Sequence, residues 1–198
     1  MKIELIEFTH NPEKLIEKSG RTCYKSEKNI SDESAGIFCK SIINRGHESV
    51  LEHASATFKI SEISRACSHQ LVRSRIASFC QESQRYVKQN NFNFVIPDSI
   101  KKSFQYLNYL SLMARIKNLY CEMLLDENIN PEDARFILPN ACHTEIVMTM
   151  NFREIRHFLK TRLDIHAQWE IRKLAELILD EMMKIAPNVF CDIKKAGD

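Results

Sequence analysis

Glycine is scarce in this chain, and its scarcity limits the nucleotide-binding folds that the chain can adopt. Of 198 residues only four are glycine: Gly20, Gly36, Gly46 and Gly197. The dinucleotide-binding fingerprint G-x-G-x-x-G and the phosphate-binding loop G-x-x-x-x-G-K-[ST] both need glycines at closer spacings than these. We therefore exclude a Rossmann nucleotide site and a P-loop. If the protein binds phosphates, it must do so with arginine side chains and helix N-termini.

Length and composition predict one folded domain over residues 1–198. Hydrophobic residues make up 44% of the chain and charged residues 27%, which is typical of a soluble folded protein and excludes disorder as the main state. The sequence has no internal repeat, low-complexity tract or Pro/Gly/Ser-rich linker. It also lacks an apolar run of about 18 residues and the basic-then-apolar start of a signal peptide, so we expect a cytoplasmic protein.

The cysteines predict neither a disulfide framework nor a metal site. They are odd in number and contain no C-x-x-C pair: Cys23, Cys39, Cys67, Cys80, Cys121, Cys142 and Cys191. We interpret them as reduced thiols, mostly in the core. His47 and His53 do not have the four-residue helical spacing of a zinc-binding H-E-x-x-H motif, so no metal is expected.

The pattern of apolar residues, caps and breakers predicts an α+β fold. Strands are expected at 2–8, 51–60, 86–96 and 145–150. Helices are expected at 11–20, 31–46, 62–73, 98–126 and 130–139, and through the last third from Asn151, ending in a long helix at 168–185. We expect Trp169 to be a core anchor of that last helix. The aromatic residues Phe92, Phe94, Tyr106 and Tyr109 are expected to be helix and strand core.

Arginine is concentrated in two windows although the net charge is only +2. Eight of the twelve arginines lie in 65–85 and 153–172: Arg65, Arg73, Arg75, Arg85, Arg153, Arg156, Arg162 and Arg172. Lys160 is the only lysine in either window. One reading is solvated helix faces with surface ion pairs. The other is planar, bidentate recognition of anions, for which arginine is preferred over lysine.

The geometry expected at these windows is specific. At the end of a helix, Arg73 and Arg75 would point to sides about 200° apart and could serve two ligands. Arg153 and His157, four residues apart, would share one helix face and could meet a common partner.

These windows carry a resemblance to a known family. Arg73, Arg75 and, after seven residues, Ser83 with Gln84-Arg85-Tyr86 resemble the signature of the flavin-dependent thymidylate synthases, the ThyX family. Other blocks from about 20 to 171 are similar to the family in the same order: Arg21-Thr-Cys-Tyr-Lys-Ser, Gly46-His47-Glu48-Ser49 with Glu52-His53, Ala134-Arg135 before Leu138-Pro139, Thr149-Met-Asn151-x-Arg153, and Arg162 followed by His166-Ala-Gln-Trp-Glu170.

The resemblance implies a ThyX-like fold, with a small antiparallel or mixed sheet, several helices and active sites at subunit interfaces of a homotetramer. It implies reductive methylation of dUMP to dTMP, with 5,10-methylenetetrahydrofolate as carbon donor, NADPH as reductant through FAD, and no protein nucleophile. The implied dUMP-binding residues are Gln70, Arg73, Gln81, Ser83, Arg85, Arg135 and Arg162, with Arg162 catalytic at the uracil. The implied FAD-binding residues are His47, Ser49, Arg73, Ser74, Arg75, Gln81, Asn151, Arg153 and His157.

One position departs from the family and leaves alternatives open. The signature usually reads Arg-His-Arg, and here its middle residue is Ser74, which offers no flat ring to pack against the cofactor. A ThyX-fold flavoprotein with impaired synthase activity is therefore one alternative. Another is an arginine-rich nucleic-acid-binding module, against which the balanced charge argues. Ser83 has no neighbouring base in the sequence and Cys142 is interpreted as structural, so neither is expected to be a nucleophile.

Overall fold

The structure, a computed structural model, describes residues 1–195 and 197. These form two compact units. Unit 1 comprises Met1–Lys2, Ser61–Gln70 and Cys80–Ile146, and unit 2 comprises Ile3–Ile60, Leu71–Phe79 and Val147–Asp198. The prediction of a single domain for residues 1–198, two of which lie outside the described residues, stays a prediction. No helix in the described part of the chain has the length and apolar character needed to cross a membrane.

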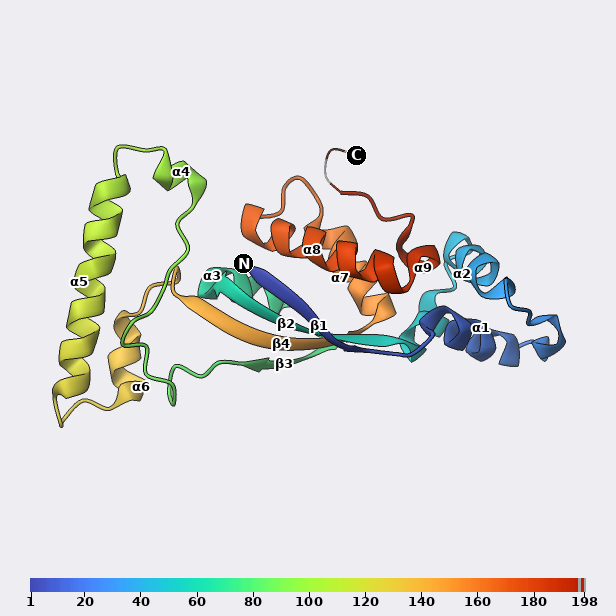
Figure 1. Ribbon diagram of the computed structural model, residues 1–198, viewed down its shortest axis with the longest axis horizontal. Coiled ribbons are helices and arrows are strands. Elements are labelled where there is room, and N and C mark those ends of the chain that lie inside the picture. The colour runs from blue at the N-terminus through green and yellow to red at the C-terminus, as the bar shows by residue number, and fades with distance from the viewer. Residues whose placement is uncertain (196, 198) are drawn as a thin grey trace. The chain divides into compact units, whose positions relative to one another are not determined.

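Four strands are interspersed among the helices along the chain (Figure 1). In order they are β1 (Lys2–Phe8), α1 (Pro12–Thr22), η1 (Glu27–Asn29), α2 (Ser34–Asn44), η2 (Glu48–His53), β2 (Ser55–Ser64), α3 (Arg65–Leu71), β3 (Ala77–Gln81), α4 (Asp98–Lys101), α5 (Tyr106–Leu125), α6 (Pro131–Ala134), η3 (Arg135–Ile137), β4 (His143–Asn151), α7 (Phe152–Arg162), α8 (Trp169–Ile185) and α9 (Pro187–Phe190), where η denotes a 3-10 helix.

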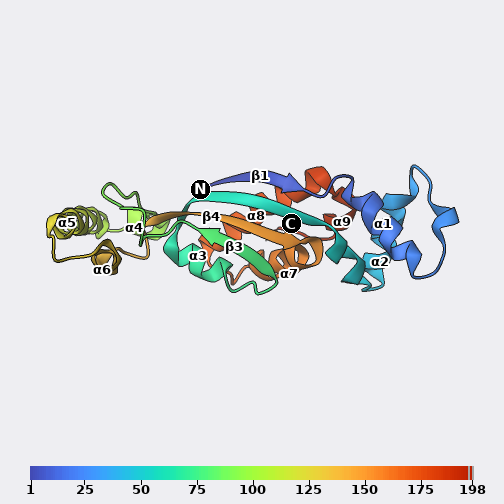
Figure 2. The same ribbon diagram turned by 90° about the horizontal axis from the view of Figure 1, so that it is seen from below.

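The strands form one four-stranded sheet in the order β1-β2-β4-β3, which Figure 2 shows from below. β1 and β2 are antiparallel, since Met1 contacts Glu62 and Thr9 contacts Ser55. β2 and β4 are also antiparallel, since Ala54 contacts Phe152 and Thr57 contacts Thr149. Burial alternates along β2 as far as Ile60 and then shifts by one residue at Glu62, whose φ is 59°. An extra residue of this kind bends a strand without ending it. The sheet and helices confirm the α+β class.

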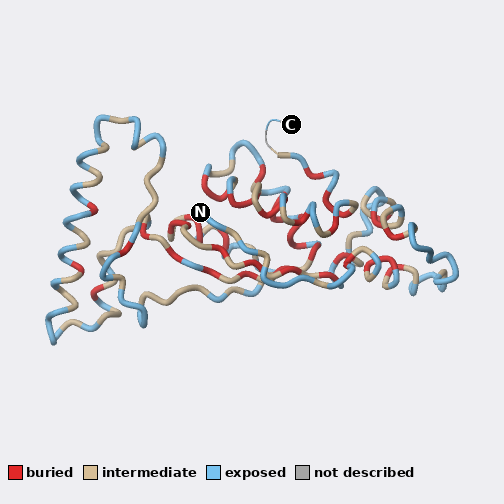
Figure 3. Tube along the Cα trace, viewed as in Figure 1, coloured by how far each residue is buried: buried red, intermediate tan, exposed pale blue. Residues whose placement is uncertain are grey.

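Helices α7 and α8 cover the part of the sheet that belongs to unit 2. Both lie on the same side of β2 and β4 in Figures 1 and 2. As predicted, Asn151 caps α7 by accepting a hydrogen bond from the backbone N–H of Glu154 at 2.9 Å. Gln168 caps α8 in the same way. Buried positions recur along both helices at helical spacing, so their apolar stripes form the core against the strands (Figure 3).

The third strand was predicted in the wrong place. The segment 86–96 makes only an isolated bridge between Phe94 and Cys142, whereas β3 is formed by Ala77–Gln81. The ring of Phe94 instead contacts the rings of Phe92 and Tyr109 edge-on. The aromatic residues that suggested a strand therefore pack their rings together. The strand β3 was not predicted, because its sequence is short and about half polar.

Two other boundaries differ from expectation for local reasons. The predicted strand at 51–60 begins only at Ser55, because residues 48–53 form the 3-10 helix η2. The predicted helix at 98–126 is divided into α4 and α5. Between these, the Ser103 hydroxyl donates to the Ile100 carbonyl and accepts from the Gln105 N–H, and such side-chain bonds compete with helical ones.

The burial of Trp169 and of most cysteines was also predicted wrongly. Trp169 is 44% exposed at the first turn of α8, and Glu170 and Ile171 take the inward positions instead. Of the seven thiols, three are buried, Cys121 is half-buried and three are exposed. All seven are free cysteines.

Candidate functional site

The arginines of the first window do not extend from a helix as expected. Helix α3 ends at Leu71, and residues 72–76 form a turn before β3. The predicted 200° separation of Arg73 and Arg75 is therefore wrong. Both arginines line the same hollow, of about 270 Å³, together with Ser74. The two cations can thus act on one ligand.

The opposite wall of this hollow comes from α7. Five residues of this helix line the hollow: Glu154, His157, Phe158, Thr161 and Arg162. They recur every three or four residues, apart from neighbouring pairs, and so lie toward one side of the helix. Three arginines, Arg73, Arg75 and Arg162, therefore line a single concave space. Residues about 85 positions apart in the sequence are brought together by the packing of unit 2.

A second hollow, of about 470 Å³, adjoins the first. It is lined by Glu48, Glu52, Asn151 and Arg153, and it shares Ile76, Glu154 and His157 with the first. We call the two hollows together the groove. As predicted, Arg153 and His157 lie on the same side of α7, since both line this second hollow.

Acidic side chains temper the positive charge of the groove. Arg153 Nη1 donates to Glu52 Oε1 at 2.5 Å, and this bond raises the pKa of Arg153. Burial raises the pKa of Glu154, an effect that the nearby His157 partly offsets. Glu154 is only 7% exposed. A buried carboxyl among arginines gives the groove a hydrogen-bond acceptor as well as its donors.

Sequence reasoning missed the acidic residues of the groove. Glu48 and Glu52 lie in the block 46–53 and Glu154 directly follows the block 149–153, but no carboxylate was among the predicted ligands. The sequence signal that could have indicated these carboxylates was their position, because Glu52 lies beside His53 in a family block and Glu154 lies beside the predicted ligand Arg153. Two predicted FAD residues, His47 and Ser49, are exposed at the start of η2 and line neither hollow.

The remaining predicted ligands belong to unit 1, where one of them, Gln81, lies in a polar cluster. The Gln81 amide donates to Ser68 Oγ at 2.8 Å and to Thr144 Oγ1 at 3.1 Å. Arg65, which was not predicted as a ligand, also donates to Thr144, at 3.4 Å. Burial lowers the pKa of Arg65, and its neighbour Arg135 lowers it further. This cluster holds the Gln81 side chain in one orientation.

Two predicted phosphate ligands of unit 1 share a partner. Arg85 Nε lies 2.6 Å from Glu132 Oε2, and Arg135 Nε donates to the Glu132 backbone carbonyl at 3.0 Å. Ser83 Oγ accepts from the backbone N–H of Arg85 at 3.3 Å. Gln70 is half-buried at the end of α3. The prediction that these residues and the groove arginines bind one dUMP stays a prediction.

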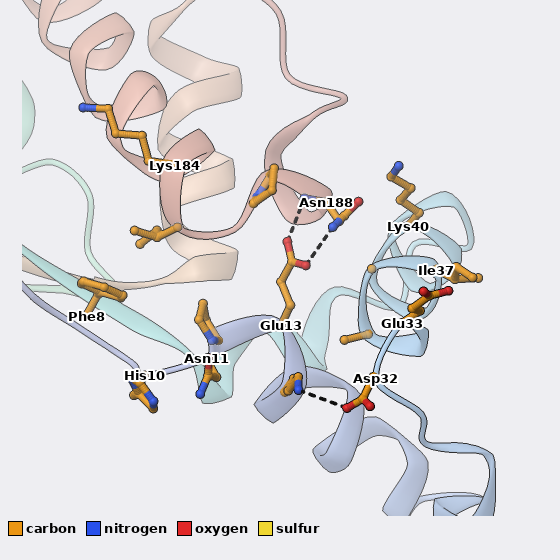
Figure 4. Close-up of a pocket in the computed structure, with 16 residues that line it drawn as sticks. Phe8, His10, Asn11, Glu13, Asp32, Glu33, Ile37, Lys40, Lys184 and Asn188 are labelled. Carbon is orange, nitrogen blue, oxygen red and sulfur yellow. Dashed lines mark hydrogen bonds and ion pairs between the residues drawn. The ribbon is translucent and has the colours of Figure 1, made fainter.

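A larger cavity of unit 2 contains none of the predicted site residues. It measures about 730 Å³ and lies where the starts of α1 and α2 approach α9 (Figure 4). Glu13 accepts hydrogen bonds from the backbone and side-chain N–H groups of Asn188, both at 2.8 Å, and Lys14 pairs with Asp32 at 3.8 Å. The cations among its described lining residues are lysines and not arginines, so the cavity lacks the forked donors of the groove.

The structure has an α+β fold and an arginine-lined groove, built without a glycine loop, whose cations are suited to an anionic ligand. Residues 4–188 match the model of the family described as Thy1, thymidylate synthase complementing protein. The chain belongs to this family.

Similar proteins agree with this assignment. A flavin-dependent thymidylate synthase of Clostridium tetani is 38% identical over 212 residues, covering 96% of this chain and 85% of the relative. One of Geobacter sulfurreducens is 43% identical over 201 residues, covering 97% and 86%. A crystal structure of Thymidylate Synthase X (ThyX) from Helicobacter pylori with FAD and dUMP is similar in fold, with a TM-score of 0.80 at 23% identity over 98% of each chain. The ThyX-like fold is confirmed.

Proposed function

We infer that this chain is a flavin-dependent thymidylate synthase, which converts dUMP to dTMP by reductive methylation with FAD as cofactor. The observation that carries this conclusion is the convergence of Arg73, Arg75 and Arg162 on one hollow, in a chain that belongs to the family. The nucleic-acid-binding alternative is not favoured, because the relatives that match nearly the whole chain are synthases. Methylenetetrahydrofolate as carbon donor and NADPH as reductant complete the proposal.

The groove suits a phosphate-bearing cofactor. Its guanidinium groups can form charge-assisted, bidentate hydrogen bonds to phosphate oxygens, and Ser74 and Thr161 add hydroxyls. The residues that would hold FAD are Arg73, Ser74, Arg75, Asn151, Arg153 and His157, with His47, Ser49 and Gln81 assigned by family resemblance. When bound, the flavin supplies the hydride transfer that no amino-acid side chain can perform.

The nucleotide residues have distinct physical tasks. Arg162 is proposed to act at the uracil, where its positive charge favours a polarised ring with negative charge on a carbonyl oxygen. Arg73, Arg85 and Arg135 supply cations for the phosphate, and Gln70, Gln81 and Ser83 supply neutral hydrogen bonds. Arg85 and Arg135 are already held at Glu132, so their guanidinium groups have a defined starting position.

The proposed mechanism uses no nucleophile from the protein. Cys142 is buried, and burial, with the Glu82 carboxylate, raises its pKa to about 11. A thiol of that pKa is almost entirely protonated at neutral pH and a poor attacker. The amide of Gln84 bonds to the Cys142 sulfur at 3.8 Å, which fits a structural role.

A homotetramer in the cytoplasm belongs to the same proposal. Helix α5 supports association with further copies, because four of its six leucines are exposed and are spread along its length: Leu107, Leu112, Leu119 and Leu125. Phe104 and Phe136, also in unit 1, are more than 80% exposed. Several large apolar side chains exposed within one unit are a feature of protein interfaces. The same chain of another subunit is the proposed occupant.

Spectroscopy and tritium release test the function. The purified protein should bind FAD, show a flavin spectrum that NADPH bleaches, and show a shift of that spectrum on adding dUMP. It should also release tritium from dUMP labelled at carbon 5, with methylenetetrahydrofolate present. Failure to take up added FAD would overturn the proposal. Flavin binding without tritium release would instead identify the flavoprotein with impaired synthase activity.

A further inference from the structure

Arg156 is the one arginine of the second window whose side chain is completely buried, among the residues that the structure describes. Sequence reasoning grouped it with the anion-binding arginines. In the structure it lines neither hollow of the groove, is 0% exposed, and is the largest fully buried side chain of the described residues. A buried guanidinium is stable only when its charge and its N–H groups are matched.

The match is complete for this side chain. Arg156 Nη1 and Nη2 each donate to one oxygen of the Asp192 carboxylate at 2.7 Å. Nε and Nη2 also donate to Glu48 Oε1 at 3.3 Å, and Nη1 also donates to the Val189 carbonyl. These contacts use all five N–H donors of a guanidinium. Lys160 Nζ approaches Glu48 Oε1 as well, at 3.2 Å, so two cations balance two carboxylates.

The cluster joins three segments that lie far apart in the sequence. Glu48 begins η2, Arg156 lies in the middle of α7, and Asp192 follows α9. Glu48 also lines the second hollow of the groove, with Glu52 from the other end of η2. The same carboxylate that Arg156 holds is therefore part of the groove wall.

We propose that Arg156 and Asp192 are positioning residues of the flavin site, which act through Glu48 to hold η2 against α7 and so fix the groove wall. This inference rests on the proposed function for the identity of the ligand. Asp192 lies beyond residues 4–188, the part of the chain that matches the family model. A residue outside the family match is thus assigned to the support of the family's site.

The test compares Asp192→Asn with a matched control. Asp180→Asn also removes a partly exposed carboxylate of unit 2, which pairs with Lys195 at 2.5 Å and contacts neither η2 nor α7 in the described ion pairs. In the ligand-free protein, hydrogen exchange of the backbone amides of residues 48–53 should accelerate roughly 100-fold in Asp192→Asn, the scale expected when a buried charge loses its partner. It should not change in Asp180→Asn.

The flavin provides the second readout. FAD affinity should fall about 10- to 100-fold in Asp192→Asn and in Glu48→Gln, because displacement of a site by about an ångström has effects of this size. Arg156→Lys keeps the positive charge but loses the forked guanidinium geometry, so its FAD affinity should lie between that of these variants and that of the wild type. All affinities are measured at a temperature where circular dichroism shows every variant to be folded.

The outcomes separate the two proposals. If Asp192→Asn lowers only the unfolding temperature and leaves both the exchange of residues 48–53 and the FAD affinity unchanged, the cluster is merely structural and the inference is wrong. If the wild-type protein does not bind FAD, the proposed function fails. The exchange experiment still decides in that case whether the cluster holds η2.

Discussion

Arg153 and Glu52 are joined across the groove by a bond of 2.5 Å between Nη1 and Oε1, with about half of each side chain exposed. A phosphate bound by Arg153 would have to compete with this carboxylate. Exposed pairs of this kind are weak, because water and salt screen the two charges. Glu52→Gln should therefore tighten FAD binding by up to about fivefold, and the gain should shrink in high salt. Titration of the apoprotein with FAD measures this change in affinity. Weaker FAD binding by Glu52→Gln than by the wild type would show that Glu52 itself supports the ligand.

Arg162 should be indispensable for turnover but not for folding. It lies on the wall of the first hollow, in the last turn of α7, and Arg162→Ala should lower turnover at least about 100-fold, the scale of losing one charged donor at a reacting centre. Arg45→Ala, at an exposed position after α2, is the control and should keep wild-type turnover. Tritium release and circular dichroism are the measurements. Retained activity in Arg162→Ala would remove this residue from the site.

Ser74→His tests the departure from the family signature. Ser74 lines the first hollow between Arg73 and Arg75, where an imidazole could pack against a ring of the cofactor. Aromatic packing contributes about 0.5–1.5 kcal/mol, so FAD affinity should rise ~2- to 12-fold. Ser74→Ala, which also lacks the ring, should show no such rise. No gain in affinity or rate in Ser74→His would mean that serine is tolerated here without consequence.

Glu154 should make the protein less stable as the pH rises. Burial raises its pKa above the ordinary value of 4.5, so at pH values between the two the folded protein holds a proton that the unfolded chain has released. Stability therefore falls as pH rises through this interval and levels off above the folded pKa. Glu154→Gln cannot ionise and should be more stable than wild type at pH 8, with the difference vanishing below pH 4.5.

Urea unfolding at several pH values between 4 and 8 measures this difference. The control is Glu127→Gln, at an exposed position after α5, which should follow the wild-type pH profile. A Glu154→Gln variant that is less stable than wild type at pH 8 would show that the carboxylate is a stabilising partner in the groove.

The thiols should differ sharply in reactivity. Burial and the Glu13 and Glu17 carboxylates raise the pKa of Cys39 to about 12, and the pKa of Cys142 is about 11, whereas Cys23, Cys80 and Cys191 are exposed. Only the thiolate is alkylated efficiently, so iodoacetamide at pH 8 should modify the exposed three and spare Cys39 and Cys142 until urea is added. Peptide mass spectrometry identifies the modified sites. Rapid alkylation of native Cys142 would contradict its structural assignment.

Local signals predicted much of the fold because they act within a few residues. Helices α7 and α8 begin directly after Asn151 and Gln168, where helices are expected. Strand β4 contains the expected strand at 145–150, and α1 begins one residue after the expected start at 11. The failures arose where the deciding partner lies far away. The aromatic segment 86–96 packs its rings instead of pairing as a strand, and Glu170 instead of Trp169 turns into the core.

The candidate site follows the same division. A glycine loop for phosphates could be excluded from the few glycines of the chain, and the two arginine windows could be read from the order of its residues. Which of these arginines can meet a ligand depends on how distant segments pack together. Arg73 and Arg162 line an open hollow, while Arg156, in the same window as Arg162, is buried against Glu48 and Asp192. The exposure of each arginine and the identity of its counter-ion depend on segments more than 30 residues away along the chain, as Glu48 and Asp192 show for Arg156. No local sequence pattern encodes these contacts.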